Sequence, residues 1–266
     1  MSESLVLAAR QGPVLTLTLN RPAALNSFTS ELHRQLAAAL DAAAADAEVR
    51  CLVLTGAGRG FCAGQDLSDP LAAPAPEGQP PTDLRVVLDT FYRPLLQRLR
   101  SMPVPVIAAV NGVAAGAGAN LALNCDFVLA ARSDSFIQAF VKIGLVPDTG
   151  GNWLLPRLVG RARALGLAML GDKLPAPEAE RIGLIWKCVD DEALAGDAAA
   201  LALRLAALPT QALVSTRNAI DRAQEQSFEQ ALDDEAALQS RLGKAHDYLE
   251  GVAAFGAKRA PKFTDR

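Results

Sequence analysis

The sequence predicts an α/β fold built from stacked strand and helix units, with a helical region after it. Half of the 266 residues are hydrophobic, which is enough for a sizeable core. In the first half of the chain, short strand-like runs alternate with turns and helical segments. In the last third, helical periodicity replaces most strand patterns. These observations favour one elaborate α/β core with a helical extension.

Three runs predict buried strands. Residues 14–19 alternate apolar side chains with threonine, and residues 51–55 and 106–110 are almost entirely apolar. Turns containing glycine, proline or asparagine follow, and helical patterns appear at residues 30–45 and 118–124. The recurring order of strand, turn and helix indicates a stacked β/α core, although the units share no detectable sequence identity.

A proline-rich segment interrupts this order. Residues 70–81 hold five of the sixteen prolines. Because proline fixes φ and cannot donate to a sheet, the segment predicts a loop, and strand-helix patterns resume directly after it. A lid over a site and a plain surface excursion both explain such a loop.

Beyond about residue 149 the pattern is mainly helical. Helices are expected at residues 176–181, 192–207, 210–223, 228–242 and 246–258. We expect residues 1–200 to form the core, which carries the site, and residues 201–266 to form a helical region. Such a region can pack on a neighbouring subunit or on its own core, and both arrangements remain open.

Charge and hydropathy exclude several classes of partner. The net charge is −3 with both signs interspersed, so no basic surface for nucleic acid is expected. No run of about 18 uncharged apolar residues exists, and the start Met-Ser-Glu-Ser does not resemble a leader. We therefore expect no membrane partner and a cytoplasmic location.

The cysteines predict no metal centre. Cys51, Cys62, Cys125 and Cys188 are far apart and form no CxxC pair. This spacing fits reduced thiols better than a disulfide framework or a zinc site.

One carboxylate and two glycine-rich loops predict the chemistry. Asp148 lies in the run Gly-Leu-Val-Pro-Asp-Thr-Gly-Gly at residues 144–151, after loops at residues 61–67 and 111–118. Glycine loops can aim backbone N–H groups at a developing oxyanion, and the aspartate can move a proton. Taken alone, Asp148 after proline and before Thr-Gly-Gly would favour a helix N-cap. Together with the loops it indicates chemistry through a thioester enolate.

Four motifs in order carry a family resemblance. They are Asn-Arg-Pro-Ala-Ala-Leu-Asn at 20–26, Phe-Cys-Ala-Gly-Gln-Asp-Leu at 61–67, Asn-Gly-Val-Ala-Ala-Gly at 111–116, and the run at 144–151. The chain resembles the crotonase, or enoyl-CoA hydratase/isomerase, superfamily over nearly its whole length. Residues 147–153, 183–186 and the ending from His246 to Phe263 look like the branch that isomerises 2-(1,2-epoxy-1,2-dihydrophenyl)acetyl-CoA to oxepin-CoA in phenylacetate degradation.

The resemblance implies a spiral of ββα units, a helical trimerisation region, and a homotrimer or a hexamer made of two trimers. It implies an acyl-CoA thioester as substrate, held at its carbonyl oxygen by the backbone N–H groups of Gln65 and Ala117. No separate cofactor is expected, because coenzyme A is part of the substrate. Further substrate or CoA contacts are expected at Ala24, Ala63, Gly64, Asp66, Leu67, Gly116, Asn120 and Phe140.

Two departures from the hydratase pattern bear on activity. Hydration in this family uses two glutamates, and the matching positions here are Asn120 and Phe140. Neither side chain can act as a base near neutral pH, so efficient hydration should be absent. Asp148 instead matches the catalytic aspartate of members that isomerise or dehalogenate. Asn120 is expected to orient the acyl group or an oxygen atom of the substrate.

The resulting expectation is a single-base isomerase. Neighbours such as Phe140, Val146 and Trp153 should keep water from Asp148 and raise its pKa. Asp148 would take the C2 proton of a 3-enoyl-CoA and return it at C4. With an aryl epoxide, the same deprotonation would open the ring toward the oxepin.

Other functions remain as alternatives. They are an enoyl-CoA hydratase, an aryl-CoA dehalogenase and an acyl-CoA-binding protein without turnover. A nicotinamide enzyme is disfavoured because Leu121 replaces the third glycine of GxGxxG. A serine hydrolase lacks its GxSxG motif, and Cys62 has no evident histidine partner.

Overall fold

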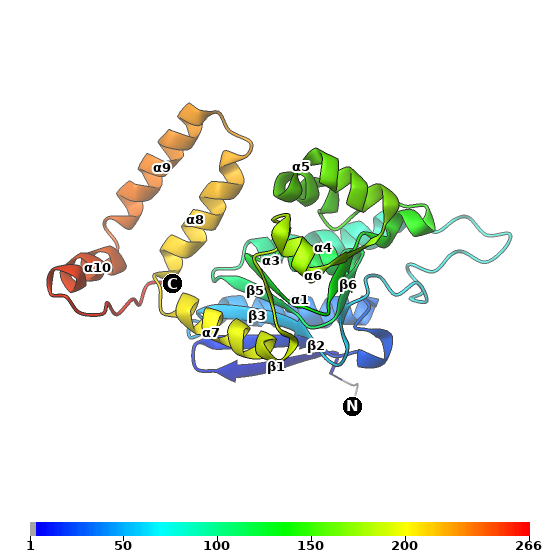
Figure 1. The fold of residues 1–266 in the computed structure, drawn as a ribbon, viewed down its shortest axis with the longest axis horizontal. Helices are drawn as coiled ribbons and strands as arrows, with labels where there is room; N and C mark the ends of the chain where they lie inside the picture. Colours follow the sequence, from blue (N-terminus) through cyan, green and yellow to red (C-terminus); the bar gives the residue numbers. More distant parts are fainter. Residues whose placement is uncertain (1–3) are drawn as a thin grey trace.

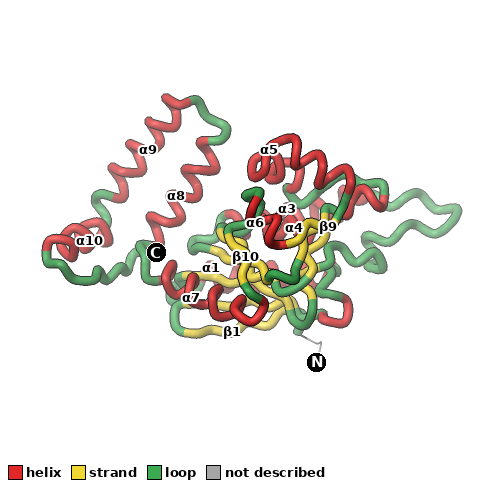
Figure 2. Tube along the Cα trace, in the orientation of Figure 1, coloured by secondary structure: helices red, strands yellow, loops and turns green. Residues whose placement is uncertain are grey.

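The structure is a computed structural model that describes residues 4–266, and its strands form two sheets (Figures 1 and 2). The larger sheet runs β1 (Val6–Gln11), β2 (Val14–Leu19), β3 (Cys51–Gly56), β5 (Val106–Val110), β7 (Phe127–Ala131) and β10 (Lys187–Val189). The smaller runs β4 (Gly60–Cys62), β6 (Val113–Ala115), β8 (Ser135–Ile137) and β9 (Lys173–Pro175). Neighbouring strands are parallel except in the β1–β2 and β8–β9 pairs.

Helices join successive strand pairs. The pairs β3–β4, β5–β6 and β7–β8 each place one strand in the larger sheet and the next in the smaller sheet. Helical segments follow each pair: α2 (Leu84–Val87), η2 (Leu88–Tyr92) and α3 (Arg93–Arg100), then α4 (Ala117–Leu123), then η3 (Ala139–Ile143) and α5 (Gly151–Leu170). This repeated ββα order confirms the fold class expected from the sequence.

Helix α1 (Ser30–Ala45) has the bounds that the sequence predicted. The Thr29 side chain accepts from the backbone N–H of Leu32 at 3.2 Å, which caps its first turn. Leu32, Leu36 and Leu40 recur every four residues and are buried in the main core. The helix therefore begins at a cap and is held by one apolar face.

Helix α7 (Leu194–Ala206), which the short η4 turn (Asp191–Ala193) precedes, covers the other face of the larger sheet. Helix α6 (Ala176–Arg181) packs instead in the main core through Ala176 and Ala179. The buried residues Leu194 and Ala202 of α7 pack in a second core with strand residues such as Val53 and Ile107. The boundary expected at residue 200 falls inside α7. The apolar face of this helix packs in the second core on both sides of residue 200.

The last three helices extend away from the sheets, as Figure 1 shows in yellow to red. They are α8 (Thr210–Ala223), α9 (Phe228–Leu242) and α10 (His246–Gly256), close to the predicted ranges. Ion pairs tether α8 to the core, from Arg217 to Asp126 at 3.0 Å and from Arg100 to Asp221 at 2.8 Å. Helix α9 has no buried residue among those described.

Several elements were not anticipated. Helix α5 is interrupted by a non-helical glycine, Gly160, and strands β9 and β10 lie beyond residue 149. Residues 70–81 do form a loop without helix or strand, as predicted. It is the long excursion in cyan in Figure 1.

In residues 4–266, no single helix has the length and apolar character needed to cross a membrane. Residues 191–206 and 210–223 pass that test only as a pair, and the pair is bent by 103°.

Candidate active site

A cavity opens at the carboxyl ends of three neighbouring strands of the smaller sheet. Strands β4, β6 and β8 run parallel and side by side, so the loops after them meet at one edge. The cavity measures about 370 Å³. Of the residues predicted for the site, those that line it are Ala63, Gly64, Gln65, Leu67, Gly116, Ala117, Phe140 and Asp148.

Backbone pairing turns the Gln65 N–H toward this cavity. Phe28 donates to Gly64 O at 2.7 Å and accepts from the Asp66 N–H at 2.8 Å. Because alternate residues of an extended chain present their N–H groups to opposite sides, the Gln65 N–H points away from Phe28. In residues 4–266 it donates to no protein acceptor.

The second N–H belongs to Ala117, the first residue of α4. The first N–H groups of a helix lack intrahelical acceptors and carry partial positive charge. No protein acceptor for the Ala117 N–H lies within the described chain. The preceding Gly116 has φ +52°, so the chain turns sharply out of β6 there.

Close backbone contact holds these two loops together. A Cβ on Gly64, which has φ +93°, would lie 2.8 Å from Ala115 O and 3.4 Å from Ala117 N. A Cβ on Gly118 would lie 2.2 Å from Cys62 O. Only glycine permits both approaches, so the two free N–H groups lie side by side at the cavity wall.

The Gln65 side chain fixes its own loop. Its amide nitrogen donates to Phe28 O at 3.1 Å and Asp66 O at 3.2 Å, and its amide oxygen accepts from Tyr92 Oη at 2.8 Å. Because both ends of the Gln65 side-chain amide are bonded to protein, the backbone N–H is the group of Gln65 that can bind a ligand.

Asp148 is partly buried, and its carboxylate is the only one that lines the cavity within the described chain. Thr149 Oγ1 donates to its Oδ1 at 2.7 Å. Burial raises the pKa of Asp148, and the Thr149 hydrogen bond opposes part of that rise. Its carboxylate does not cap α5, whose N-cap is Gly150 without a side-chain bond. The structure therefore does not support the alternative that Asp148 is a helix cap.

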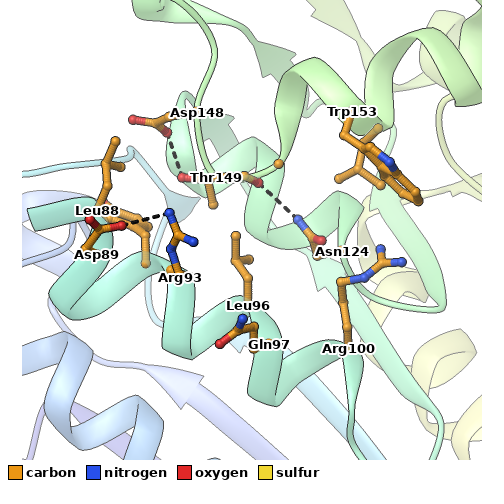
Figure 3. A pocket seen from close by; sticks show the side chains of 13 residues that line it. Leu88, Asp89, Arg93, Leu96, Gln97, Arg100, Asn124, Asp148, Thr149 and Trp153 are labelled. Carbon is orange, nitrogen blue, oxygen red and sulfur yellow. Dashed lines mark hydrogen bonds and ion pairs between the residues drawn. The ribbon is translucent and has the colours of Figure 1, made fainter. Parts of the chain in front are cut away.

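Asp148 also borders a second, more open groove of about 370 Å³, drawn in Figure 3. Tyr92 and Leu88 line both spaces with it. The groove continues along α3 past Arg93 and ends near Trp153. Asp148 thus lies between the cavity and an open groove that charged side chains such as Arg93 and Arg100 also line.

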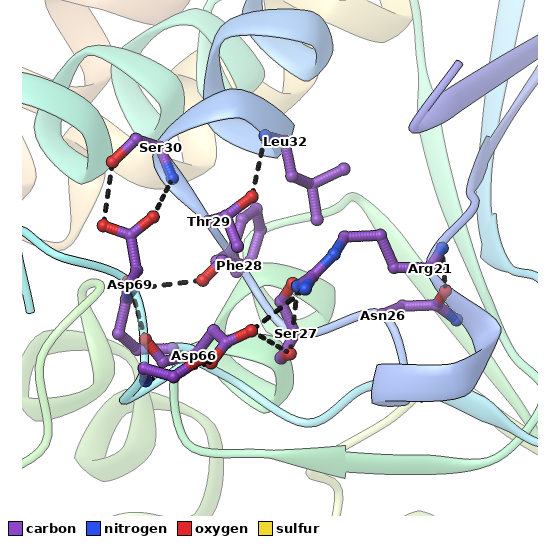
Figure 4. A network of polar contacts seen from close by, with 11 residues as sticks. Arg21, Asn26, Ser27, Phe28, Thr29, Ser30, Leu32, Asp66 and Asp69 are labelled. Atoms are coloured by element: carbon purple, nitrogen blue, oxygen red, sulfur yellow. Dashed lines mark hydrogen bonds and ion pairs between the residues drawn. The ribbon is translucent and has the colours of Figure 1, made fainter. Parts of the chain in front are cut away.

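The remaining predicted contacts lie outside the cavity lining. Asn120 is fully buried, with both amide atoms bonded to protein, and it is not part of the cavity lining. Its expected contact with a substrate stays a prediction. Ala24 lies in η1 (Pro22–Ala24) on the loop before Phe28. Asp66 accepts from Arg21 at 3.0 Å and from Ser68, a network drawn in Figure 4.

This network makes Asp66 a brace between two loops. Its hydrogen bonds to Ser68 and then its contacts with Arg21 lower its pKa, so it stays ionised. Arg21 also donates to the backbone oxygen of Ser27. The loop that carries Ala24 is thereby tied to the loop that carries Gln65, which places Ala24 and Asp66 as supports of the cavity.

Sequence reasoning missed Tyr92. It lies at the end of η2, a π-helical turn, and stacks edge-on with Phe28 and His33 at 5.6 and 4.4 Å between ring centres. Burial raises its pKa well above the usual value, so its hydroxyl remains a donor. Only the aromatic pair at residues 91–92 could have signalled it, and π-turns leave no clear sequence period.

Two further candidate groups lie apart from this chemistry. Burial raises the pKa of Cys62 to about 12, which disfavours the thiolate that a nucleophile needs. His246, Asp247 and Asp265 offer ligand atoms within 4.8 Å of one another. Asp247 there accepts from the backbone of Thr264 at 2.7 Å, and so anchors the end of the chain.

Comparisons with known proteins point to one family. The enoyl-CoA hydratase/isomerase family model matches residues 9–266. A 1,2-epoxyphenylacetyl-CoA isomerase of Escherichia coli (strain K12) is 53% identical over 261 residues, 98% of each chain. A "Probable enoyl-CoA hydratase" of Rhodobacter capsulatus is 48% identical over 250 residues, 94% of each. A solved enoyl-CoA hydratase from Bacillus anthracis has TM-score 0.90 at 31% identity, covering 98% of this chain and 100% of that one.

Proposed function

The chain belongs to the enoyl-CoA hydratase/isomerase family and is an enzyme of it, and we propose that it isomerises acyl-CoA thioesters through an enolate with Asp148 as the only acid/base. The observation that carries this proposal is made in residues 4–266. One cavity pairs a single, partly buried carboxylate with two backbone N–H groups that donate to no protein acceptor. Such a site can make and quench an enolate without activating water.

The first step is removal of a proton from C2. The N–H groups of Gln65 and Ala117 donate to the thioester oxygen, and Asp148 takes the C2 proton. The negative charge then lies on the thioester oxygen. Both N–H groups bind this anionic oxygen more strongly than they bind the neutral carbonyl. One donor of this kind lowers the barrier by about 3 to 4 kcal/mol.

The second step returns the proton. For a 3-enoyl-CoA, the protonated Asp148 delivers it to C4, and the double bond moves from C3–C4 to C2–C3. Substrate and product have the same composition, so no water and no separate cofactor is consumed. A carboxyl whose pKa is raised by burial suits both directions of transfer.

A ring epoxide on an acetyl-CoA arm is the second substrate class. Removal of the C2 proton sends the electron pair into the ring, opens the epoxide and permits expansion to the oxepin. The proton on Asp148 returns to the product. The relative of 53% identity is a 1,2-epoxyphenylacetyl-CoA isomerase, and the apolar lining here, with Phe140 and Tyr92, suits a six-membered ring. A role in phenylacetate degradation follows from this proposal.

Hydration has less support, although several relatives carry hydratase names. One hydratase glutamate position is held by Asn120, fully buried and bonded to protein, and the other by Phe140. Neither can activate water. Dehalogenation would use Asp148 as a nucleophile.

Binding of acyl-CoA without turnover has less support, because it would not require a carboxylate with a raised pKa in the cavity.

Two incubations, each with wild type and Asp148→Asn, test the proposal. Ultraviolet spectroscopy and mass spectrometry follow a 3-enoyl-CoA and, separately, a 2-enoyl-CoA. We expect wild type to convert the 3-enoyl substrate without a mass change and Asp148→Asn to bind it without conversion. A mass gain of one water on the 2-enoyl substrate would favour a hydratase, and binding without turnover by wild type would favour a binding protein.

A further inference from the structure

Three side-chain amides converge on the backbone of the Asp148 loop. They donate to three consecutive carbonyls: Asn152 to Pro147 O, Asn120 to Asp148 O at 2.8 Å, and Asn124 to Thr149 O at 3.2 Å. We propose that these asparagines form a positioning clamp, which holds the Asp148 carboxylate at a fixed place relative to the Gln65 and Ala117 N–H groups. This inference rests on the proposed function.

Two members of the clamp share an element with the oxyanion donor. Asn120 and Asn124 lie four residues apart at one side of α4 and its end, and Ala117 begins the same helix. Residues 117–123 are all buried. One buried helix therefore presents the Ala117 N–H at its start and donates hydrogen bonds to the Asp148 loop from its side and end. This arrangement fixes the spacing between the Ala117 N–H and Asp148.

The orientation of Asn120 is determined by its partners. Gln138 Nε2 donates to Asn120 Oδ1 at 2.9 Å, so the amide nitrogen must face the Asp148 carbonyl. Asn120 has 0% exposed surface. A Cβ on Gly151 would lie 2.4 Å from its Nδ2, so the loop closes directly over the amide.

The loop needs such support because it contains an unfavourable backbone conformation. Thr149 has φ +51°, a left-handed value that β-branched residues rarely adopt. Such a conformation persists only where the surroundings hold it. The Asn124 amide holds the Thr149 carbonyl, and the Thr149 hydroxyl donates to the Asp148 carboxylate. Thr149 thus connects Asn124, at the end of α4, to the Asp148 carboxylate, as the dashed lines in Figure 3 show.

The test compares Asn120→Ala, Asn124→Ala and Asn152→Ala with wild type. Gln211→Ala is the matched control, because Gln211 also donates an amide to a carbonyl, that of Arg266 at 3.3 Å, but on α8. We expect kcat on a 3-enoyl-CoA to fall about 100-fold in Asn120→Ala, with KM within about twofold, since a displaced base weakens the chemical step more than binding. The control should keep both values.

Amide hydrogen exchange of residues 144–154 gives a readout independent of turnover. The Gly151 N–H, which donates to Asp148 O at 2.8 Å, should exchange faster in the clamp variants and not in the control. Should Asn120→Ala fail to fold, Asn152→Ala, at an exposed position, tests the same idea with an expected loss in kcat of about tenfold.

Unchanged kcat in folded variants, or an equal change in KM and kcat, would overturn the clamp while leaving the isomerase proposal intact. Unchanged exchange of the loop would overturn it as well. A wild-type protein without turnover would overturn the proposed function itself, and with it the purpose of the clamp in catalysis.

Discussion

At the scale of single residues, the site depends on how Asp148 is shielded and hydrogen-bonded. Its burial raises its pKa and the Thr149 hydroxyl limits that rise. Sequence reasoning singled out Asp148 as the carboxylate in a glycine-containing run, and the family resemblance implied Gln65 and Ala117, each of which directly follows a glycine. It could not identify the roles of Asn120 and Tyr92, because their hydrogen bonds join segments 27 and 28 residues apart.

The pH profile follows from this shielding. Asp148 must be ionised to take a proton, so kcat/KM should rise with pH through a pKa above the usual range of an aspartate and then level off. Thr149→Ala removes a bond that favours the ionised form and should move this rise to higher pH. Thr149→Ser keeps the hydroxyl and should move it little. A shift to lower pH in Thr149→Ala would contradict the assignment. Rates measured across pH check this.

A second carboxyl should affect stability and not catalysis. Burial and then the neighbouring Asp191 raise the pKa of Asp134 to about 6, and its Oδ2 is buried without a partner in the described chain. A raised folded-state pKa means that its contribution is present below about pH 4 and is lost as pH rises through about 6. Asp134→Asn should therefore increase the free energy of unfolding at pH 7, by up to about 3 kcal/mol.

Urea unfolding of wild type and Asp134→Asn at several pH values measures this. The two proteins should be alike near pH 4 and diverge between about pH 4 and 6. An equal difference at all pH values would mean that the effect comes from packing and not from ionisation.

At the scale of elements, the oxyanion donors depend on close packing of short strands. Residues 14–19, 30–45 and 106–110 could be predicted because they are long enough to show a period. Strands β4, β6 and β8 are three residues each, too short for periodicity, and were not anticipated. Their partners in the smaller sheet, and not their own sequence, define them.

Gly118→Ala tests this packing. The added Cβ would meet Cys62 O at 2.2 Å, so α4 must move away from β4 and carry the Ala117 N–H with it. We expect kcat to fall about 100-fold or more and stability to fall by about 1 to 3 kcal/mol. Gly196→Ala on α7, where a Cβ meets nothing within 4 Å, is the control. It should retain activity and gain up to about 1 kcal/mol. Equal kinetics for the two variants would contradict the account.

At the scale of the whole molecule, the C-terminal helices expose a large apolar surface. Phe255 is 88% and Phe228 is 75% exposed, with Leu249 and Val252 beside Phe255 on α10. Large apolar side chains gathered on an exposed helix, as on α10, often mark an interface. The sequence predicted the helices from their period, but one chain cannot reveal which surface a second copy covers. The proposal of a trimer or hexamer rests on the family resemblance and this surface.

Phe255→Asp should reduce the assembly. A charge placed in an apolar contact is costly to bury, so sedimentation velocity should show a smaller species than wild type at the same concentration. Leu7→Asp, on exposed strand β1, is the control and should sediment as wild type does. A wild-type protein that sediments as a monomer would contradict the trimer proposal.

The central claim is that one carboxylate both takes and returns the proton. The most direct measurement uses a 3-enoyl-CoA with both C2 hydrogens replaced by deuterium, converted in ordinary water by wild type and Asp148→Asn, with mass spectrometry of the product: one deuterium stays on C2, and a second is present only if it was transferred. The account predicts that wild type transfers part of the deuterium to C4 and that Asp148→Asn gives no product while still binding the substrate. Conversion by Asp148→Asn at the wild-type rate would contradict it.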